Sequence, residues 1–256
     1  MSQSMSSNAE KPAKKKSELR ETIIVVIEAL LIALVFRTFL YQPFSIPTAS
    51  MQSTLMIGDY FVASKFTWGF GKYSFPISLP FNGRFLTFNE PKVGEVAVFR
   101  NEITNEDYIK RIIGTPGDRI QMKEGRLYIN GTMVEREKIG DGTDTDSEMR
   151  SVPVTIYRES LPNGVSHVIQ EIADNGPLDN TAEYVVPAGH YFMMGDNRDR
   201  SQDSRVLNAV GYVPFDAFIG KAEARFFSIT NNIPPWQLWE WPANVRWDRM
   251  FQSIYN

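Results

Sequence analysis

An apolar segment near the start of the chain, Ile23–Tyr41, constrains the fold more than any other feature. It has the sequence IIVVIEALLIALVFRTFLY, and about twenty apolar residues suffice to cross the hydrocarbon core of a bilayer as a helix. The apolar side chains favour insertion by roughly 4–7 kcal/mol, Glu28 opposes it by about 3 kcal/mol at most, and Arg37 lies near the end. We therefore predict a transmembrane anchor over residues 22–42.

Two other interpretations of this segment are less well supported. A core helix of a soluble domain would have an amphipathic polar face, which is missing here. A cleaved signal peptide would have a shorter apolar run and a small-residue cleavage site directly after it. A retained anchor fits the pattern better than either.

Basic residues flank the anchor unequally. Residues 1–17 are polar without an apolar period, and we predict a disordered tail over residues 1–21. Because positive charge stays on the cytoplasmic side, the tail is predicted to be cytoplasmic and everything after the anchor to lie outside. The basic residues before the span are Lys11, Lys14, Lys15, Lys16 and Arg20, and only Arg37 lies close to its far end.

Composition excludes several functional classes. The net charge is -3 over 256 residues, with no basic stripe in the body of the chain, so we expect no nucleic-acid partner. Zero cysteines exclude disulfides, thiolate nucleophiles and cysteine-type zinc sites together. The two histidines, His167 and His190, stand outside any metal-binding spacing, so we predict neither a metal nor a cofactor.

The rest of the chain has the pattern of β-strands. Short segments such as DYFVASKF, EVAVFR and HYFMMGD alternate in polarity, are rich in aromatic and β-branched residues, and are separated by Gly, Asn and Pro. No long helical period appears. We predict a mainly β fold in which an antiparallel β domain is formed by residues 43–134 and 185–230.

Residues 135–184 have a different composition, and we predict a smaller, hairpin-rich insertion lobe there. VPVTIYRES and VSHVIQEI alternate as strands, whereas REKIGDGTDTDSEMR is polar and rich in Gly and Asp. Its acidic residues lack the glycine position and the distal glutamate of a calcium loop, so we expect a solvated acidic loop. These residues are Asp141, Asp144, Asp146 and Glu148.

The C-terminal segment, residues 231–256, is aromatic. Placed on a helix, VRWDRMFQSIY gathers its apolar side chains on one face, namely Trp247, Met250, Phe251, Ile254 and Tyr255. Tryptophan favours the membrane interface, which suggests an interfacial helix. A terminal helix packed on the β domain is an equal alternative.

Ser50, in the stretch FSIPTASMQSTL just beyond the anchor, is a candidate nucleophile. A serine hydroxyl needs a base to remove its proton. The chain has no GxSxG elbow, no SxxK motif and no Walker or GxGxxG loop. A Ser-His-Asp triad stays an alternative, since triads assemble from distant positions, and it would use His167 or His190.

A lysine can serve as the base if burial lowers its pKa enough to make it neutral. Lys110, in the apolar strand DYIKRIIGTPGD, shares one face with Tyr108 and Ile112, while Arg111 points to the other face. Lys110 is therefore a candidate base. The alternative is an ordinary lysine that faces the solvent.

Three motifs follow the apolar segment in order: IPTASMQSTLMIGDY, DYIKRIIGTPGD and MGDNRDRSQDSR. Together they resemble bacterial signal peptidase I, the leader peptidase of the Ser/Lys-dyad family, and the third motif is the most specific. The resemblance covers the anchor and most of the β domain. It implies Ser50 as nucleophile and Lys110 as general base.

The resemblance also implies supporting roles. The Thr48 hydroxyl would join the Ser50 N–H in an oxyanion hole, and Ser201 would orient the lysine amine. Asp203 and Arg205 would brace the site. The side chains implied to line the substrate pockets are Phe44, Ile46, Met51, Leu55, Tyr108 and Ile109.

The implied protein is a membrane-anchored serine endopeptidase that removes signal peptides after small residues of the Ala-X-Ala type. Its implied partners are exported preproteins and membrane phospholipid, close to the secretion translocon, and it needs no cofactor. The implied location is the bacterial cytoplasmic (inner) membrane, single-pass, with the N-terminus cytoplasmic and the catalytic domain on the periplasmic side.

Two departures and two rival functions accompany the resemblance. Ala49 replaces a frequent glycine and so does not easily adopt a positive φ, and Ser53 replaces a frequent proline. A self-cleaving repressor with a Ser/Lys site would have a DNA-binding helix-turn-helix where the apolar segment stands. A membrane-anchored binding or assembly module without catalysis would leave Lys110 solvated.

Overall fold

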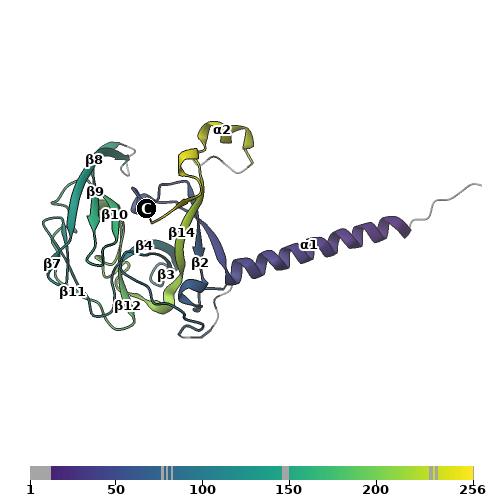
Figure 1. Ribbon diagram of the computed structural model, residues 1–256, viewed down its shortest axis with the longest axis horizontal. Helices are drawn as coiled ribbons and strands as arrows, with labels where there is room; N and C mark the ends of the chain where they lie inside the picture. Colours follow the sequence, from purple (N-terminus) through teal and green to yellow (C-terminus); the bar gives the residue numbers. More distant parts are fainter. Residues whose placement is uncertain are drawn as a thin grey trace, which may run out of the picture.

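A long helix, α1 (Ala13–Phe39), projects from a body made of β-strands (Figure 1). The structure is a computed structural model that describes residues 13–75, 78, 80–81, 83–145, 150–230, 233 and 236–255. The strand pairings within the body's sheets are antiparallel. The predicted mainly β fold with a single N-terminal apolar helix is confirmed.

Helix α1 is longer at its beginning and shorter at its end than the predicted anchor. Glu18–Phe39 is long and apolar enough to cross a membrane. The predicted disorder is wrong from Ala13 onward, because Ala, Lys, Glu, Leu and Arg favour helix and extend an existing helix without new nucleation. Residues 1–12 lie outside the described part. Tyr41 already belongs to the first strand, so the last residues of the predicted anchor are not helical.

The largest sheet carries the candidate site. Its strand order is β1-β2-β14-β3-β4-β12-β13, and β15 pairs with the far end of β14. The strands are β1 (Tyr41–Ser45), β2 (Asp59–Ser64), β3 (Val96–Asn101), β4 (Glu106–Gly114), β12 (His190–Met194), β13 (Val213–Pro214), β14 (Phe218–Ser228) and β15 (Gln252–Ser253).

Strand β4 connects three packed regions of the body. Ile109 packs against a cluster around Phe61, Ile112 belongs to a second cluster around Trp68, and Ile113 belongs to a third. A strand that is buried on both faces has little freedom to shift its register, because a one-residue slip would turn every side chain to the other face. The side chains of β4 are therefore held in fixed positions.

Two smaller sheets complete the body. One has the order β11-β5-β6-β7 and the other β10-β9-β8, and Figure 1 shows the second on the side of the body away from α1. Their strands are β5 (Arg119–Lys123), β6 (Arg126–Ile129), β7 (Thr132–Met133), β11 (Tyr184–Val185), β8 (Glu135–Thr145), β9 (Ser151–Ser160) and β10 (Ser166–Glu171).

Strand β8 corrects the prediction of a solvated acidic loop. Residues 135–145 pair along β9 and are polar because this strand lies at the edge of its sheet. Asp144 is buried at 4% exposure, whereas Asp141 is exposed and pairs with Lys138. Asp146 and Glu148 lie outside the described residues.

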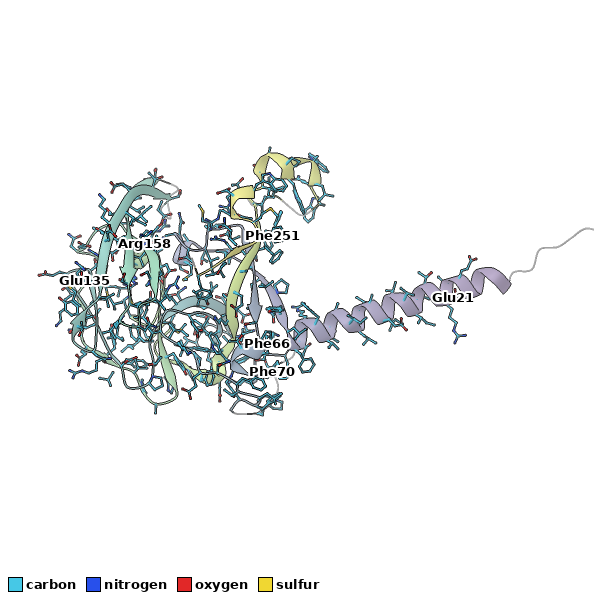
Figure 2. All side chains as sticks on the ribbon, viewed as in Figure 1. Glu21, Phe66, Phe70, Glu135, Arg158 and Phe251 are labelled. Atoms are coloured by element: carbon cyan, nitrogen blue, oxygen red, sulfur yellow. The ribbon has the colours of Figure 1, made fainter. Side chains whose placement is uncertain are left out.

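The C-terminal segment is not the continuous helix that the apolar period predicted. A short helix, α2 (Trp241–Asn244), is followed by a 3-10 turn and then by β15. Strand β3 pairs with β14 only as far as Lys221, so β14 offers unpaired backbone groups beyond that point, and β15 satisfies them. Figure 2 shows Phe251 exposed on this segment.

Candidate active site

Ser50 lies in a one-turn 3-10 helix, Ala49–Met51, that follows β1. Its side chain is mostly buried, at 8% exposure of the residue. Three side chains that the family resemblance places in substrate pockets lie in the hydrophobic core beneath this turn. Ile46, Met51 and Leu55 are buried in the cluster around Phe61, and they do not line the cavity described below.

Lys110 reaches Ser50 from β4, sixty positions further along the chain. Its Nζ lies 2.7 Å from Ser50 Oγ and 3.0 Å from the Ile109 carbonyl oxygen. Burial lowers the pKa of the Lys110 amine to about 8, although the carboxylates of Asp203 and Asp196 act in the opposite direction. A solvated Lys110, as the non-catalytic alternative requires, does not match this buried position.

Thr48 stands beside the candidate nucleophile. Its Oγ1 lies 3.4 Å from Ser50 Oγ, and its backbone is extended directly before the turn. Ala49 has no positive φ, so the absence of glycine there causes no strain. Ser53 does have a positive φ, of 87°, which is uncommon for a residue with a side chain.

Residues 195–205 form a loop that backs onto this turn. Arg205 donates two hydrogen bonds of 2.9 Å to the carboxylate of Asp203, which also accepts one from the Gly195 N–H. Burial alone would raise the pKa of Asp203, but the Arg205 guanidinium holds it below its usual range. The predicted bracing residues therefore contact each other within this loop.

Ser201 is buried behind the site, but it makes no hydrogen bond to Lys110. Its hydroxyl instead interacts with the Asp203 carboxylate and helps to lower the pKa of that carboxyl. It packs against Gly195, where an added Cβ would lie 2.2 Å from Ser201 Oγ and 2.4 Å from the Ser50 carbonyl oxygen. Only glycine fits at this position.

A cavity of about 450 Å³ opens beside Ser50. Of the predicted pocket residues, Phe44, Tyr108 and Ile109 line it, together with Thr48, Ser50 and Lys110. Sequence reasoning missed the other lining residues, which are Ser45, Pro47, Phe61, Val98, Glu106, Asp107, Arg200 and Gln202. The two-residue period of β4 could have indicated Glu106, whereas Phe61 enters through its pairing with Phe44, which no local pattern reveals.

Both histidines lie away from this cavity. His167 is buried, with Nε2 3.4 Å from Glu159 Oε2, and burial lowers its pKa to about 4. His190 Nδ1 lies 2.9 Å from the Ala188 carbonyl oxygen. In the described structure neither contacts Ser50, so the geometry gives no support to a histidine triad. The described residues also contain no cluster of acidic or histidine side chains that could hold a metal.

Comparisons with known proteins agree on one family. A family model described as "Signal peptidase, peptidase S26" matches residues 19–227. Signal peptidase I of Rickettsia typhi is 38% identical over 247 residues, which cover 88% of this chain and 90% of that protein. Signal peptidase I of Rickettsia massiliae is 36% identical over 271 residues, covering 98% and 96%. A crystal structure of a signal peptidase I from Enterococcus faecalis V583 has 23% identity and a TM-score of 0.32, covering 53% of this chain and 98% of that one.

The family model and the two Rickettsia relatives define the chain as a serine endopeptidase. The family model covers most of the sequence, and the relatives match it over nearly their full length. The chain belongs to the signal peptidase family, peptidase S26.

Proposed function

We propose that this endopeptidase removes signal peptides from exported preproteins, with Ser50 as nucleophile and Lys110 as general base. The observation that carries the proposal is the 2.7 Å distance between Lys110 Nζ and Ser50 Oγ, with the amine buried. A general base must lie within hydrogen-bond reach of the proton it removes and have a pKa near the working pH. The amine of Lys110, with a pKa of about 8, meets both requirements.

The chemistry is acyl transfer. The lone pair of neutral Lys110 Nζ accepts the hydroxyl proton while Ser50 Oγ attacks the scissile carbonyl carbon. The C–N bond then breaks, and Lys110 delivers that proton to the leaving amine. In the second half, Lys110 takes a proton from a water molecule whose oxygen attacks the acyl carbon. The ester C–O bond then breaks, and Lys110 returns that proton to Ser50 Oγ.

The Thr48 hydroxyl and the Ser50 N–H are the proposed oxyanion donors. The 3.4 Å between Thr48 Oγ1 and Ser50 Oγ supports this, because a donor must lie next to the carbon that the nucleophile attacks. Each such donor contributes roughly 3 kcal/mol in other acyl-transfer enzymes. In our proposal Asp203 and Arg205 brace the loop behind these groups, and Ser201 packs against it.

We propose cleavage after small residues of the Ala-X-Ala type. The cavity is modest, and Phe44, Phe61, Val98, Tyr108 and Ile109 give it an apolar wall next to Ser50. Methyl-sized side chains gain free energy by contact with such a wall, and the restriction to small residues is what the family resemblance implies.

The membrane placement is part of the proposal. Helix α1 would cross the bacterial cytoplasmic membrane once, with the basic N-terminus inside and the β body on the periplasmic side. Exposed aromatic side chains would contact phospholipid, and the anchor would hold the site near the translocon where preproteins emerge. The exposed aromatics of the C-terminal segment are Trp236, Trp239, Trp247 and Phe251.

Cleavage of a purified preprotein by the full-length chain in lipid vesicles tests the proposal. Ser50→Ala and Lys110→Met are each expected to abolish cutting. His190→Ala, outside the cavity, should cut at the wild-type rate. Appreciable turnover by Lys110→Met would refute the proposed base.

A further inference from the structure

Asn197 connects the segment that carries Ser50, residues 49–53 (the nucleophile turn), to the β8–β10 sheet. It is fully buried, and its backbone N–H donates to the Ser50 carbonyl oxygen at 3.2 Å. Its side-chain Nδ2 donates to the Ala49 carbonyl oxygen at 3.1 Å and to Asp144 Oδ2 at 2.8 Å. Asn197 therefore binds the carbonyl groups on both sides of the Ser50 Cα, those of Ala49 and of Ser50 itself.

Asp144 determines which way the Asn197 amide points. A carboxylate only accepts hydrogen bonds, so the NH₂ end of the amide must face Asp144. The same NH₂ group supplies the bond to Ala49, whereas the opposite orientation would present an oxygen to two acceptors. Asn197 Oδ1 has no hydrogen-bond partner in the described part of the chain. A buried acceptor without a partner costs folding free energy, so this arrangement is not favoured for stability alone.

Asp144 is itself fixed by several contacts. Its Oδ2 accepts from Gln170 Nε2 at 3.1 Å and lies 3.1 Å from Arg200 Nη1. The Gln170 N–H donates to the Asp196 carbonyl oxygen at 2.9 Å, which joins β10 to the loop that carries Asn197. The position of Asp144 is therefore set by these contacts, and Asp144 in turn orients the Asn197 amide.

The same sheet holds the other end of the nucleophile turn. Ser53 Oγ donates to the Val168 carbonyl oxygen of β10 at 3.0 Å. Ser53 is the residue with φ of 87°, so this bond helps to hold a conformation that the side chain disfavours. The turn is thus connected to the β8–β10 sheet on both sides of Ser50.

The Ala49 carbonyl matters because of peptide geometry. The Ala49 C=O and the Ser50 N–H belong to one planar, trans peptide unit. A donor bound to Ala49 oxygen therefore fixes the direction of the Ser50 N–H, and it also polarises that N–H as a hydrogen-bond donor. This N–H is one of the two proposed oxyanion donors.

We propose that Asn197, oriented by Asp144, is a positioning residue for the oxyanion hole. The proposal rests on the proposed role of Ser50 and gives the β8–β10 sheet a part in catalysis. An oxyanion interaction is made in the transition state and not with the bound substrate, so its loss lowers kcat and leaves KM nearly unchanged. Misplacement by about 1 Å can cost on the order of 100-fold in rate.

The test compares full-length variants in preprotein cleavage. Asn197→Leu, which keeps the volume but removes the amide, should lower kcat by about 10- to 100-fold with KM within about threefold. Asp144→Ala should lower kcat by about 10-fold, and Asp144→Asn, which keeps an acceptor oxygen, should recover most of it. Adding Asp144→Ala to Asn197→Leu should cost little more, because the two residues act through one bond. Asp141→Asn, on the exposed part of β8, is the matched control.

A second measurement separates positioning from a structural effect. A substrate-like peptide aldehyde forms an oxyanion on Ser50, whereas a non-cleavable peptide does not. Affinity for the aldehyde should fall in parallel with kcat, and affinity for the peptide should stay within about threefold. The proposal would be overturned by an equal loss of affinity for the aldehyde and the peptide, or by an unchanged kcat in Asn197→Leu. It would also be overturned if the effects of Asn197→Leu and Asp144→Ala on kcat were fully additive.

The two proposals fail in different ways. If Asn197 has no positioning role, Ser50→Ala is still inactive and Asn197→Leu is fully active. If Ser50 is not the nucleophile, Ser50→Ala itself cuts the preprotein. Should Asn197→Leu fail to fold, the comparison of Asp144→Ala with Asp144→Asn decides the question.

Discussion

Lys110 and Arg111 are consecutive buried residues of β4, yet only Arg111 binds a carboxylate. Arg111 donates to both oxygens of Asp196, at 2.8 and 2.7 Å. Within the described residues, Lys110 hydrogen-bonds only to neutral oxygens, those of Ser50 and of the Ile109 carbonyl. A buried cation keeps its charge beside a carboxylate and tends to lose it without one. The alternation of a β-strand thus places the carboxylate-bound guanidinium of Arg111 and the amine of Lys110 on opposite faces of β4.

The first prediction concerns the pH dependence of cleavage. Lys110 must be neutral to accept a proton, so kcat should rise with pH and level off above a limb near pH 8, where the pKa of this amine lies. A free lysine would put the limb near 10.5. Rates of preprotein cleavage from pH 6 to 10 measure it. A limb at or above pH 10 would contradict a buried amine.

The second prediction concerns stability. The pKa of Lys110 is lower in the folded chain than its ordinary 10.5, so below about pH 8 folding must bury a charge. The difference between the two pKa values corresponds to a destabilisation of the folded chain by roughly 3 kcal/mol. This destabilisation is present in full at neutral pH and is relieved as pH rises from about 8 to 10.5. At pH 7 the free energy of unfolding of Lys110→Met should therefore exceed that of the wild type by up to this amount, and the difference should shrink by pH 10. Denaturant unfolding in detergent measures it, with exposed Lys138→Met as the control. A difference independent of pH would count against the idea.

The third prediction concerns the Thr48 hydroxyl. Thr48→Val keeps the shape but removes the donor, so kcat should fall by about 100- to 1,000-fold with little change in KM. Thr48→Ser keeps the hydroxyl and should stay within a few fold of wild type. Steady-state kinetics on a signal-peptide substrate distinguish the two variants. Equal activity of the Val and Ser variants would remove Thr48 from the oxyanion hole.

The fourth prediction concerns the close approach at Gly195. Gly195→Ala should destabilise the fold by about 1–3 kcal/mol and nearly abolish activity, because the new Cβ would overlap Ser201 and the Ser50 carbonyl. Gly140→Ala is the matched control, since nothing lies within 4 Å of its Cβ. Thermal unfolding and cleavage rates should separate the two. A fully active Gly195→Ala would mean that the turn tolerates displacement.

The fifth prediction concerns phospholipid contact. Variants that keep a single tryptophan at 239 or 247 should be strongly quenched by vesicles of lipid brominated along the acyl chains, because these side chains are 73% and 66% exposed. A variant that keeps only the fully buried Trp68 should be quenched little. Equal quenching at all three positions would argue against a specific lipid-contacting segment.

The mainly β fold and the apolar helix were predictable because they depend on local patterns. Strand alternation and an uninterrupted apolar run report burial directly. The C-terminal segment shows the limit of such patterns. Its apolar residues recur at helical spacing, but unpaired groups at the far end of β14 bind Gln252 and Ser253 as a strand. The partner that decides this lies far away in the sequence.

The site was only partly predictable for the same reason. Ser50, Thr48 and Lys110 stand in short motifs, and the structure brings them together. Asn197 also stands in a recognised motif, but its bonds to the turn and to Asp144 depend on how three separate elements pack. Met51 and Leu55 lie in the core behind the turn and not along the cavity, a distinction that a sequence motif alone does not make.

The junction between α1 and the body leaves little room for a hinge. Only Leu40 separates the helix from β1, and the rings of Phe39 and Tyr41 pack edge-on against Phe70 and Phe66. Figure 2 labels Phe66 and Phe70 near the end of α1. Ser50 follows within a chain length of no more than about 40 Å from the helix end. For an enzyme anchored as we propose, this short, packed connection fixes the distance of Ser50 from the bilayer. The bond that is cut is then selected by its height above the bilayer as well as by its side chains.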